Sequence, residues 1–269
     1  MENPTRDVVT RSPKRMVGIL NCRWFQSTAI HHESRLEKHF VLRTMLSPLV
    51  RGIRHQPFTL SLGGSRSYTP DFLLTFVDGQ TAVVEVKRAE RIPALRERFD
   101  EITKRLAADS RTFFVAHQGQ IEGQRRAERA ALLRRYAMLQ LKEGLINAIA
   151  EFVASKPAGV AIGAVMKHCS ATQEVVFHAI ARRHIVTGRQ LLLSKDDLVF
   201  TPTQEIGNVV AQFGTWFGCS PWGPHAGTDP RARVQQDSVR GPTDAFGDHI
   251  HARQFSLDAS GWATDTCSG

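Results

Sequence analysis

Apolar and polar positions alternate with a period of two in the segment 68–87, YTPDFLLTFVDGQTAVVEVK. Successive residues of a strand point to opposite faces, so this period predicts two β-strands with one buried face. The Asp78-Gly79 pair between them predicts a tight hairpin turn. The face that we expect to be buried carries the even positions, Phe72, Leu74, Phe76, Ala82, Val84 and Val86.

Outside the turn, the charged side chains of this hairpin, Asp71, Glu85 and Lys87, all lie at odd positions. A two-residue loop would place Asp71 and Glu85 on opposite faces of the hairpin. A three-residue loop with Gly79 in the left-handed conformation pairs Asp71 directly with Glu85 and brings Lys87 to the same side. We expect the three-residue loop, and with it a cluster of two acids and one lysine.

The pattern on either side of the hairpin predicts further helices and strands. Ser34 can cap a helix over residues 31–46, with Glu37 at the capping-box position. The other expected elements are a strand at 16–20, a strand at 50–62 that ends in a Gly-Gly turn, a helix at 89–110 and a strand at 111–119. This order suits an α/β domain in which helices flank a mixed sheet.

A second, smaller unit is expected after the first. A periodic apolar pattern predicts one long helix over 122–154, and the segment 160–200 is typical of a helix, a turn, a second helix and a two-stranded ribbon. Ser170 and Gln173 form a capping box that would open the second helix. This outline predicts a winged helix.

The remaining segment, rich in Gly, Pro, Ser, Thr and Asp and without sustained periodicity, predicts a disordered tail. The expected domains are therefore residues 1–121, 122–204 and 205–269.

Charge is distributed unevenly along the 269 residues, which carry 35 basic and 26 acidic side chains and a net charge of +9. Residues 205–269 hold seven acids and four arginines, so residues 1–204 carry the other 31 basic and 19 acidic side chains, a net +12. Such an excess fits a polyanionic partner, most simply nucleic acid.

The four cysteines are scattered and form no CxxC pair, which indicates reduced thiols rather than a disulfide framework. No apolar run approaches the roughly 20 residues that a membrane-spanning helix needs. We therefore expect a cytoplasmic, nucleoid-associated protein with no membrane partner.

The acid pair of the hairpin points to metal chemistry. Two carboxylates a few ångströms apart repel each other, so one is expected to protonate unless a cation lies between them. Mg²⁺ is typically held by one or two carboxylates together with a substrate phosphate. Lys87 in its protonated form can position an attacking water and stabilise charge on phosphorus. The expected activity is phosphodiester hydrolysis with one or two Mg²⁺ ions, or Mn²⁺ in their place.

Pro70-Asp71 followed by Glu85-Val86-Lys87 resembles the PD-(D/E)xK motif of nucleases. With the ESRLE run at 33–37 and Gln56-Pro57, the order over residues 5–120 resembles the N-terminal domain of TnsA-type transposon endonucleases. The winged-helix pattern at 125–200 is similar to the C-terminal domain of that family.

The resemblance implies a restriction-endonuclease-like fold and a definite set of site residues. Glu37, Asp71, Glu85 and Lys87 are implied as catalytic, and the metal is implied to be held by the three acids and the backbone carbonyl of Val86. Some relatives have glutamine where Glu85 stands, so the acidic form favours an active enzyme. The resemblance also implies that the chain nicks the 5′ ends of a mobile element, while a separate DDE-type transposase cuts and joins the 3′ ends. An ATP-dependent regulator of transposition is a further implied partner.

Some residues have simpler interpretations beside the catalytic one. Glu37 can serve only as a capping glutamate, in which case Glu33 is the substitute acid. Gln56 is interpreted as a strand residue with local hydrogen bonds. The histidines of this region are interpreted as solvated or DNA-facing rather than as a metal cluster; they are His31, His32 and His39.

The second unit carries candidate DNA contacts. Arg182, Arg183 and His184 end the predicted recognition helix, and Lys195 lies on the ribbon. Helix-turn-helix modules place such side chains against DNA phosphates. Winged helices also dock partner proteins, so both uses stay open.

Two alternative functions remain beside that of the transposase subunit. One is a self-sufficient nuclease of the restriction or repair type. The other is a non-catalytic adaptor that retains the nuclease fold to bridge a transposition complex to DNA. The intact Asp71, Glu85 and Lys87 set opposes the adaptor.

Overall fold

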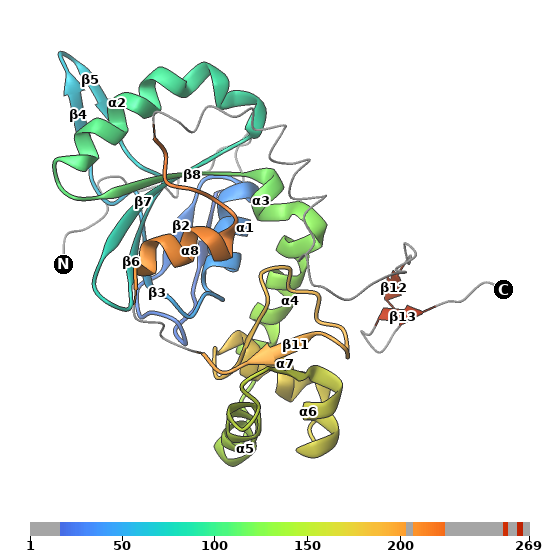
Figure 1. Cartoon of the computed structure of the whole chain (residues 1–269). Helices are drawn as coiled ribbons and strands as arrows, with labels where there is room; N and C mark the ends of the chain where they lie inside the picture. Colours follow the sequence, from blue (N-terminus) through green and yellow to red (C-terminus); the bar gives the residue numbers. More distant parts are fainter. Residues whose placement is uncertain (1–16, 203–206, 224–254, 258–262, 266–269) are drawn as a thin grey trace.

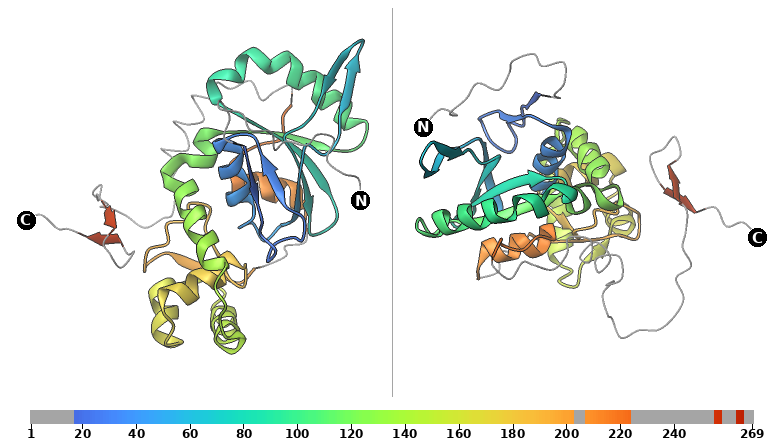
Figure 2. Two further views of the ribbon diagram at one scale, coloured as in Figure 1. Left: turned by 180° about the vertical axis from the view of Figure 1, so that it is seen from behind. Right: turned by 90° about the horizontal axis from the view of Figure 1, so that it is seen from above.

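The computed structural model describes residues 17–202, 207–223, 255–257 and 263–265. Figure 1 shows a larger unit around a four-stranded sheet and a smaller unit beside it. We call these the sheet unit and the C-terminal unit. The helix α4 (Arg126–Ala137) connects them in every view (Figure 2).

The central sheet has the strand order β3–β6–β7–β8. Its strands are β3 (Val50–His55), β6 (Phe72–Phe76), β7 (Thr81–Lys87) and β8 (Thr112–His117). The first three are antiparallel, whereas β8 runs parallel to β7, after a crossover through the helix α2 (Arg96–Ala107). The predicted α/β class with a mixed sheet flanked by helices is therefore confirmed.

The other elements of the sheet unit surround this sheet. They are β1 (Gly18–Leu20), β2 (Ile30–His32), α1 (Arg35–Thr44), β4 (Leu60–Gly63), β5 (Arg66–Tyr68), α3 (Gln118–Glu122) and the 3₁₀ turns Ala89–Arg91, Pro93–Leu95 and Gly123–Arg125. β1 pairs with β2, and β4 pairs with β5. The β4–β5 hairpin extends beside α2 (Figures 1 and 2).

The β6–β7 hairpin has the predicted register. Phe72 lies opposite Val84, and the Phe76 N–H donates to the Gln80 carbonyl at 2.9 Å across a three-residue loop. Gly79 in that loop has φ +88°, the left-handed conformation that favours glycine. The three-residue loop is confirmed, and Asp71 and Glu85 fall on equivalent positions of the two strands.

One face of the sheet packs against α1 and α8 (Val209–Phe217). The ring of Phe40 on α1 lies 5.3 Å from that of Phe72, and the ring of Phe213 on α8 lies 5.5 Å from that of Phe76. The six apolar even positions of the hairpin are buried here, as predicted.

The opposite face of the sheet is covered as well. Leu73 and Val83 belong to a second apolar cluster with Phe99 and Ile102 of α2 and with Tyr68 of β5. The charged side chains of the hairpin therefore emerge where the sheet ends rather than on an open face.

Two predicted elements of this unit are interrupted. The strand expected over 50–62 stops at Gln56, whose φ of +40° turns the chain, and Pro57 then supplies no N–H to a ladder. The helix expected over 89–110 begins with 3₁₀ turns around Pro93 and becomes α-helical only at α2.

The C-terminal unit has the element order helix, strand, helix, helix, strand, strand. These elements are α5 (Glu143–Ala154), β9 (Val160–Ala161), α6 (Ile162–His168), α7 (Gln173–Ala181), β10 (Val186–Thr187) and β11 (Leu198–Phe200). Its sheet order is β10–β11–β9, with antiparallel pairs.

Two local predictions for this region are wrong. The long helix expected over 122–154 is divided into α4 and α5, both of which pack against α7. Ser170 does not cap α7; it has φ +50°, and Thr172 is the N-cap residue. Tertiary packing has overridden the local pattern in both places.

Part of the predicted tail is also ordered. Within 205–269, the described residues 207–223 contain α8, whose Asn208 side chain caps the Ala211 N–H at 3.0 Å. The prediction of little order is wrong there. The other residues of 205–269 lie outside the described residues, except for the short strands β12 (Phe255–Leu257) and β13 (Ala263–Asp265).

Arg43 of α1 fixes the end of α8 to the sheet unit. Its guanidinium, almost fully buried, donates to the carbonyl oxygens of Trp216 and Phe217 at 3.3 and 2.9 Å and also to that of Gln120. A cation at the last carbonyls of a helix is favoured by the helix dipole. α8 is thus an integral part of this fold.

No helix among the described residues is long and apolar enough to cross a membrane. The longest, α2, α4 and α5, have 12 residues each.

His55, at the end of β3, makes the fold sensitive to acid. Burial and the neighbouring His31 and His32 lower its pKa to about 4. The unfolded chain would bind a proton to this ring below about pH 6.5, where the native state does not. The contribution of His55 to stability is therefore complete above about pH 6.5 and is lost, by as much as about 3 kcal/mol, as the pH falls to 4.

We expect His55→Phe to flatten this part of the stability profile, measured by urea unfolding between pH 4 and pH 8. The control, His168→Phe, keeps a ring stacked on Phe152 and should leave the slope as in wild type. An unchanged slope in His55→Phe would contradict the assignment.

Candidate active site

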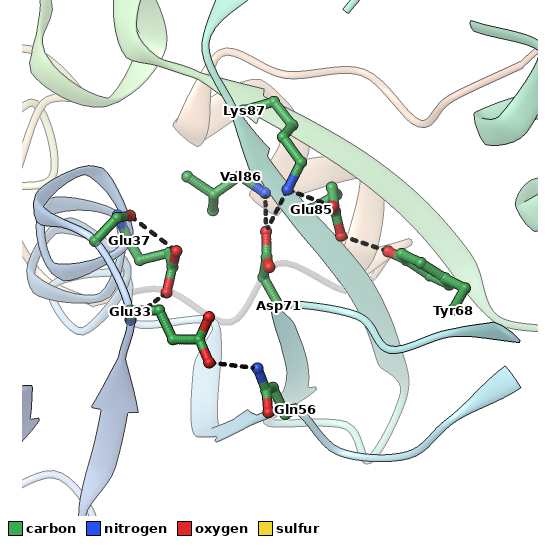
Figure 3. A network of polar contacts seen from close by, with 9 residues as sticks. Glu33, Glu37, Gln56, Tyr68, Asp71, Glu85, Val86 and Lys87 are labelled. Carbon is green, nitrogen blue, oxygen red and sulfur yellow. Dashed lines mark hydrogen bonds and ion pairs between the residues drawn. The ribbon is translucent and has the colours of Figure 1, made fainter. Parts of the chain in front are cut away.

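The charged residues of the hairpin meet at the end of β7 (Figure 3). Asp71 immediately precedes β6, where its carbonyl accepts the Gln56 N–H at 3.0 Å and ends the ladder with β3. Its side chain turns to the neighbouring strand, and Oδ2 accepts the Val86 N–H at 2.8 Å. The hairpin register therefore fixes the position of this carboxylate.

Lys87 joins the two acids. Its Nζ lies 2.5 Å from Glu85 Oε1 and 3.4 Å from Asp71 Oδ2. Burial acts to lower the pKa of Lys87, but the charges of Asp71 and Glu85 outweigh it and raise the pKa above the usual value. These contacts favour the charged form of the ammonium.

The surroundings of Asp71 oppose the ionisation of its carboxyl group. Burial and the charge of Glu85 raise the pKa of Asp71 well above its usual value, and Glu37 adds to this, while Lys87 and the Val86 N–H oppose it. The ionised carboxylate is therefore unfavourable in the free protein. Clustered groups with shifted pKa values are typical of functional sites.

Tyr68 is a member of the site that the sequence pattern did not reveal. Its hydroxyl donates to Glu85 Oε2 at 2.6 Å, and the side chain is buried. The residue enters the site on the β4–β5 hairpin, which the sequence did not predict as a separate element. In the sequence, Tyr68 was connected with the site only by its position in the same segment as Asp71, residues 68–87.

Glu37 is both a capping glutamate and a neighbour of the acid pair. Its Oε1 accepts the Ser34 hydroxyl at 2.8 Å and its Oε2 accepts the Glu33 N–H at 2.6 Å, so the capping role is confirmed. Its charge nevertheless acts on Asp71. Burial raises the pKa of Glu37 itself, against the hydrogen bonds from Glu33 and Ser34.

Gln56 and Glu33 extend the network away from Asp71. Gln56 Nε2 donates to Glu33 Oε1 at 3.1 Å, and the backbone of Gln56 is left-handed at φ +40° although the next residue is a proline. Such backbone strain is maintained only where the surroundings enforce it. The prediction of a strand residue with local hydrogen bonds is wrong, because Gln56 follows the end of β3 and bonds to Glu33 on a distant segment, beside Glu37.

The donor set fits a hard cation. Carboxylate and carbonyl oxygens are the ligands that Mg²⁺ prefers, and the Lys87 ammonium already supplies a positive charge between Asp71 and Glu85. The N–H and carbonyl of one strand residue face the same neighbour, so the Val86 carbonyl lies on the side of Asp71, like its N–H. Across residues 17–202 and 207–223, however, no three His, Cys, Asp or Glu side chains converge closely enough to hold an ion.

The histidines of α1 and β2 have other neighbours. His31 stacks on His55 with ring centroids 6.3 Å apart, and His39 Nδ1 lies 2.7 Å from Glu122 Oε1. His32 is buried against Gly18. Among the described residues these histidines do not form a metal cluster with other His, Cys, Asp or Glu side chains, and His32 and His39 are buried or paired within the chain rather than solvated.

Two residues predicted to contact DNA also donate hydrogen bonds to backbone carbonyls of other segments. Arg183 donates to the carbonyl oxygens of Ser47 and Val50 at 3.2 and 2.6 Å, and Arg182 donates to that of Ala137 at 2.8 Å. Every residue of α7 except Glu174 is buried. Only His184 and Lys195 of the predicted set are exposed.

These contacts predict a structural role for Arg183. In Arg183→Ala two buried carbonyl oxygens each lose one donor, so the free energy of unfolding should fall by about 2 kcal/mol, while the affinity for DNA stays unchanged. Chemical unfolding and fluorescence anisotropy with a labelled duplex measure the two quantities. The exposed Lys195→Ala is the control for stability. A loss of DNA affinity in Arg183→Ala without loss of stability would restore the phosphate-contact interpretation.

Comparison with known proteins agrees with the geometry. Residues 47–137 match the family model described as "TnsA-like endonuclease N terminal". That segment includes Asp71, Glu85 and Lys87, and Glu37 lies ten residues before it. No curated protein matches the chain. The match supports the resemblance read from the sequence: residues 47–137 are similar to the N-terminal domain of TnsA-like endonucleases, which points to a nuclease related to transposition.

Proposed function

We propose that this chain is the metal-dependent DNA endonuclease subunit of a heteromeric transposase and hydrolyses phosphodiester bonds at the 5′ ends of a mobile element. One observation carries the proposal: Lys87 bridges Asp71 and Glu85 within a segment that matches a TnsA-like endonuclease domain. Two acids that can hold a divalent metal, with a lysine that can stabilise charge on a phosphate, are the groups that metal-assisted hydrolysis of a phosphodiester bond uses.

The proposed roles follow from the contacts. Asp71, Glu85 and the Val86 carbonyl would hold Mg²⁺ or Mn²⁺, with Glu37 contributing through the lone pairs that its capping bonds leave. The bound ion would supply Lewis acidity and a lowered pKa of water. Lys87, in its charged form, orients the attacking water and stabilises charge on the phosphate, and the Val86 N–H keeps Asp71 Oδ2 directed at the site.

The C-terminal unit is proposed to be a winged helix. Support comes from its order of three helices and three strands and from the sheet order β10–β11–β9. Its recognition helix α7 is buried in the chain, so we propose that this unit braces the sheet unit and docks a partner rather than entering a DNA groove.

The partners that we propose are the DNA ends of the element, a DDE-type transposase subunit and an ATP-dependent regulator. The net charge of +9 supports binding to DNA. The compartment proposed is the cytoplasm, in association with the nucleoid.

A non-catalytic adaptor is the second candidate. The observation in its favour is that both oxygens of Glu37 are engaged in capping and that no three acids converge among the described residues. An adaptor would bind the same DNA and the same partner without needing a metal.

Nicking of a supercoiled plasmid that carries the ends of the element tests the proposal. Reactions contain Mg²⁺ or Mn²⁺, with and without the partner transposase, and compare wild type with Asp71→Ala. Partner-dependent nicks at the 5′ ends that disappear in Asp71→Ala are expected. Cutting without the partner would support a self-sufficient restriction or repair nuclease, and partner-dependent strand joining that survives Asp71→Ala would support the adaptor.

A further inference from the structure

Tyr68 is a buried phenol that donates to one oxygen of a site acid. The side chain is only 4% exposed, and its hydroxyl lies 2.6 Å from Glu85 Oε2. Glu85 is itself 5% exposed, so water cannot readily replace the phenol as a donor. This hydrogen bond to a carboxylate is therefore a strong one.

The two oxygens of Glu85 consequently differ. Oε2 is occupied by Tyr68, while Oε1 faces Lys87 Nζ at 2.5 Å, and the same Nζ lies 3.4 Å from Asp71 Oδ2. Figure 3 shows Tyr68 and Lys87 on opposite sides of the carboxylate. A cation between the two acids would meet one oxygen of Glu85 and not two.

The phenol cannot easily leave this position. The ring of Phe113 meets that of Tyr68 edge-on at 6.4 Å, and the Arg98 guanidinium lies 5.8 Å from its centroid. Arg98 is in turn anchored by donating to the Ser67 carbonyl at 3.4 Å. The side chain is thus held by packing against strand β8 and helix α2.

We propose that Tyr68 is a positioning residue that restricts Glu85 to single-oxygen ligation and thereby makes the site select Mg²⁺ and Mn²⁺ over Ca²⁺. Mg²⁺ requires near-octahedral geometry with few protein ligands, whereas Ca²⁺ takes six to eight oxygens and accepts bidentate carboxylates. This inference rests on the proposed metal-dependent function and deepens it.

Tyr68→Phe removes only the hydroxyl and frees Oε2 for bidentate ligation. The sequence contains two tyrosines, so Tyr136→Phe, whose ring packs edge-on against Phe177, is the matched control. Free Mn²⁺ is measured by electron paramagnetic resonance during titration of wild type and both variants. Competition by Mg²⁺ and by Ca²⁺ then gives the ratio of their affinities without any cleavage assay.

The expected result is a loss of about tenfold in the preference for Mg²⁺ over Ca²⁺ in Tyr68→Phe, with the ratio in Tyr136→Phe equal to that in wild type. Thermal unfolding shows whether Tyr68→Phe is folded; a merely structural role would change stability and leave the ratio unaltered. If folded Tyr68→Phe has the same ratio of Mg²⁺ to Ca²⁺ affinity as wild type, this inference is overturned but the proposed function is not. If wild type binds Mn²⁺ no better than Asp71→Asn, both the metal site of the proposed function and this inference are contradicted.

Discussion

Replacing Lys87 with alanine is expected to lower the rate of DNA cleavage about 10³-fold, because the site loses its only direct donor to charge that develops on the phosphate. The same change leaves Asp71 and Glu85 without the ammonium that lies 3.4 and 2.5 Å from them. We therefore expect the affinity for Mn²⁺ to rise while cleavage falls. Single-turnover cleavage in the presence of the partner transposase and a Mn²⁺ titration measure these two effects.

The opposite directions of these effects distinguish catalysis from folding. A misfolded variant would lose both activity and metal binding. Lys195→Ala, which removes an exposed lysine of the C-terminal unit, should change neither quantity. A Lys87→Ala enzyme that cleaves at more than a tenth of the wild-type rate would contradict the assigned role.

Replacing Asp71 with asparagine is expected to abolish cleavage and to stabilise the fold. Asparagine keeps an oxygen for the Val86 N–H but removes a charge whose ionisation is opposed by burial and by Glu85. The expected gain is about 1 kcal/mol at pH 7, or about 2–4 °C in the unfolding midpoint. Calorimetry and the cleavage assay measure the two changes.

The sign of the pH dependence follows from the direction of the shift. The native pKa of Asp71 lies above its value in the unfolded chain, so its contribution to stability is present below about pH 4 and is lost as the pH rises towards neutrality. The advantage of Asp71→Asn should therefore grow between pH 4 and pH 7. Asp78→Asn, in the exposed hairpin turn, is the control. An Asp71→Asn protein less stable than wild type at pH 7 would contradict this electrostatic account.

The sequence was sufficient to predict the centre of the site. Strand alternation with a glycine in the left-handed turn determines the β6–β7 register, and that register places Asp71 beside Glu85 and Lys87. The residues that form these contacts are close together in the sequence, so few alternative pairings compete with them. Ser34 and Glu37 were predictable for the same reason, since a capping box spans one helical turn.

Contacts between distant segments were not predictable in this way. Tyr68 reaches Glu85 only because β4 and β5 form their own hairpin, after Gln56 turns the chain out of the sheet. A left-handed residue before a proline has no signature in a hydrophobic pattern. The division of 122–154 into two helices that pack against α7 was not predictable for the same reason, because it depends on contacts between distant segments.

The arginines show what a charge pattern does not reveal. Arg182 and Arg183 match the basic end of a recognition helix, yet their partners are backbone carbonyls of other segments. Arg43 of α1 is likewise buried, and it contacts the end of α8. The composition of the segment that contains α8 had predicted little order. Composition reports neither which carbonyls a fold leaves without donors nor where a guanidinium will find them.

The central claim is that Asp71, Glu85 and Lys87 direct water to a phosphodiester at the 5′ end of the element, with the 3′ oxygen as the leaving group. Cleavage in ¹⁸O-labelled water, with the partner transposase and Mg²⁺ present, tests this most directly. Mass spectrometry of the cut strand is predicted to find one ¹⁸O atom in a 5′-phosphate beside an unlabelled 3′-hydroxyl, with this product formed about 10³-fold more slowly by Lys87→Ala. A labelled 3′-phosphate, or an equal yield of the labelled 5′-phosphate from Lys87→Ala, would contradict the account.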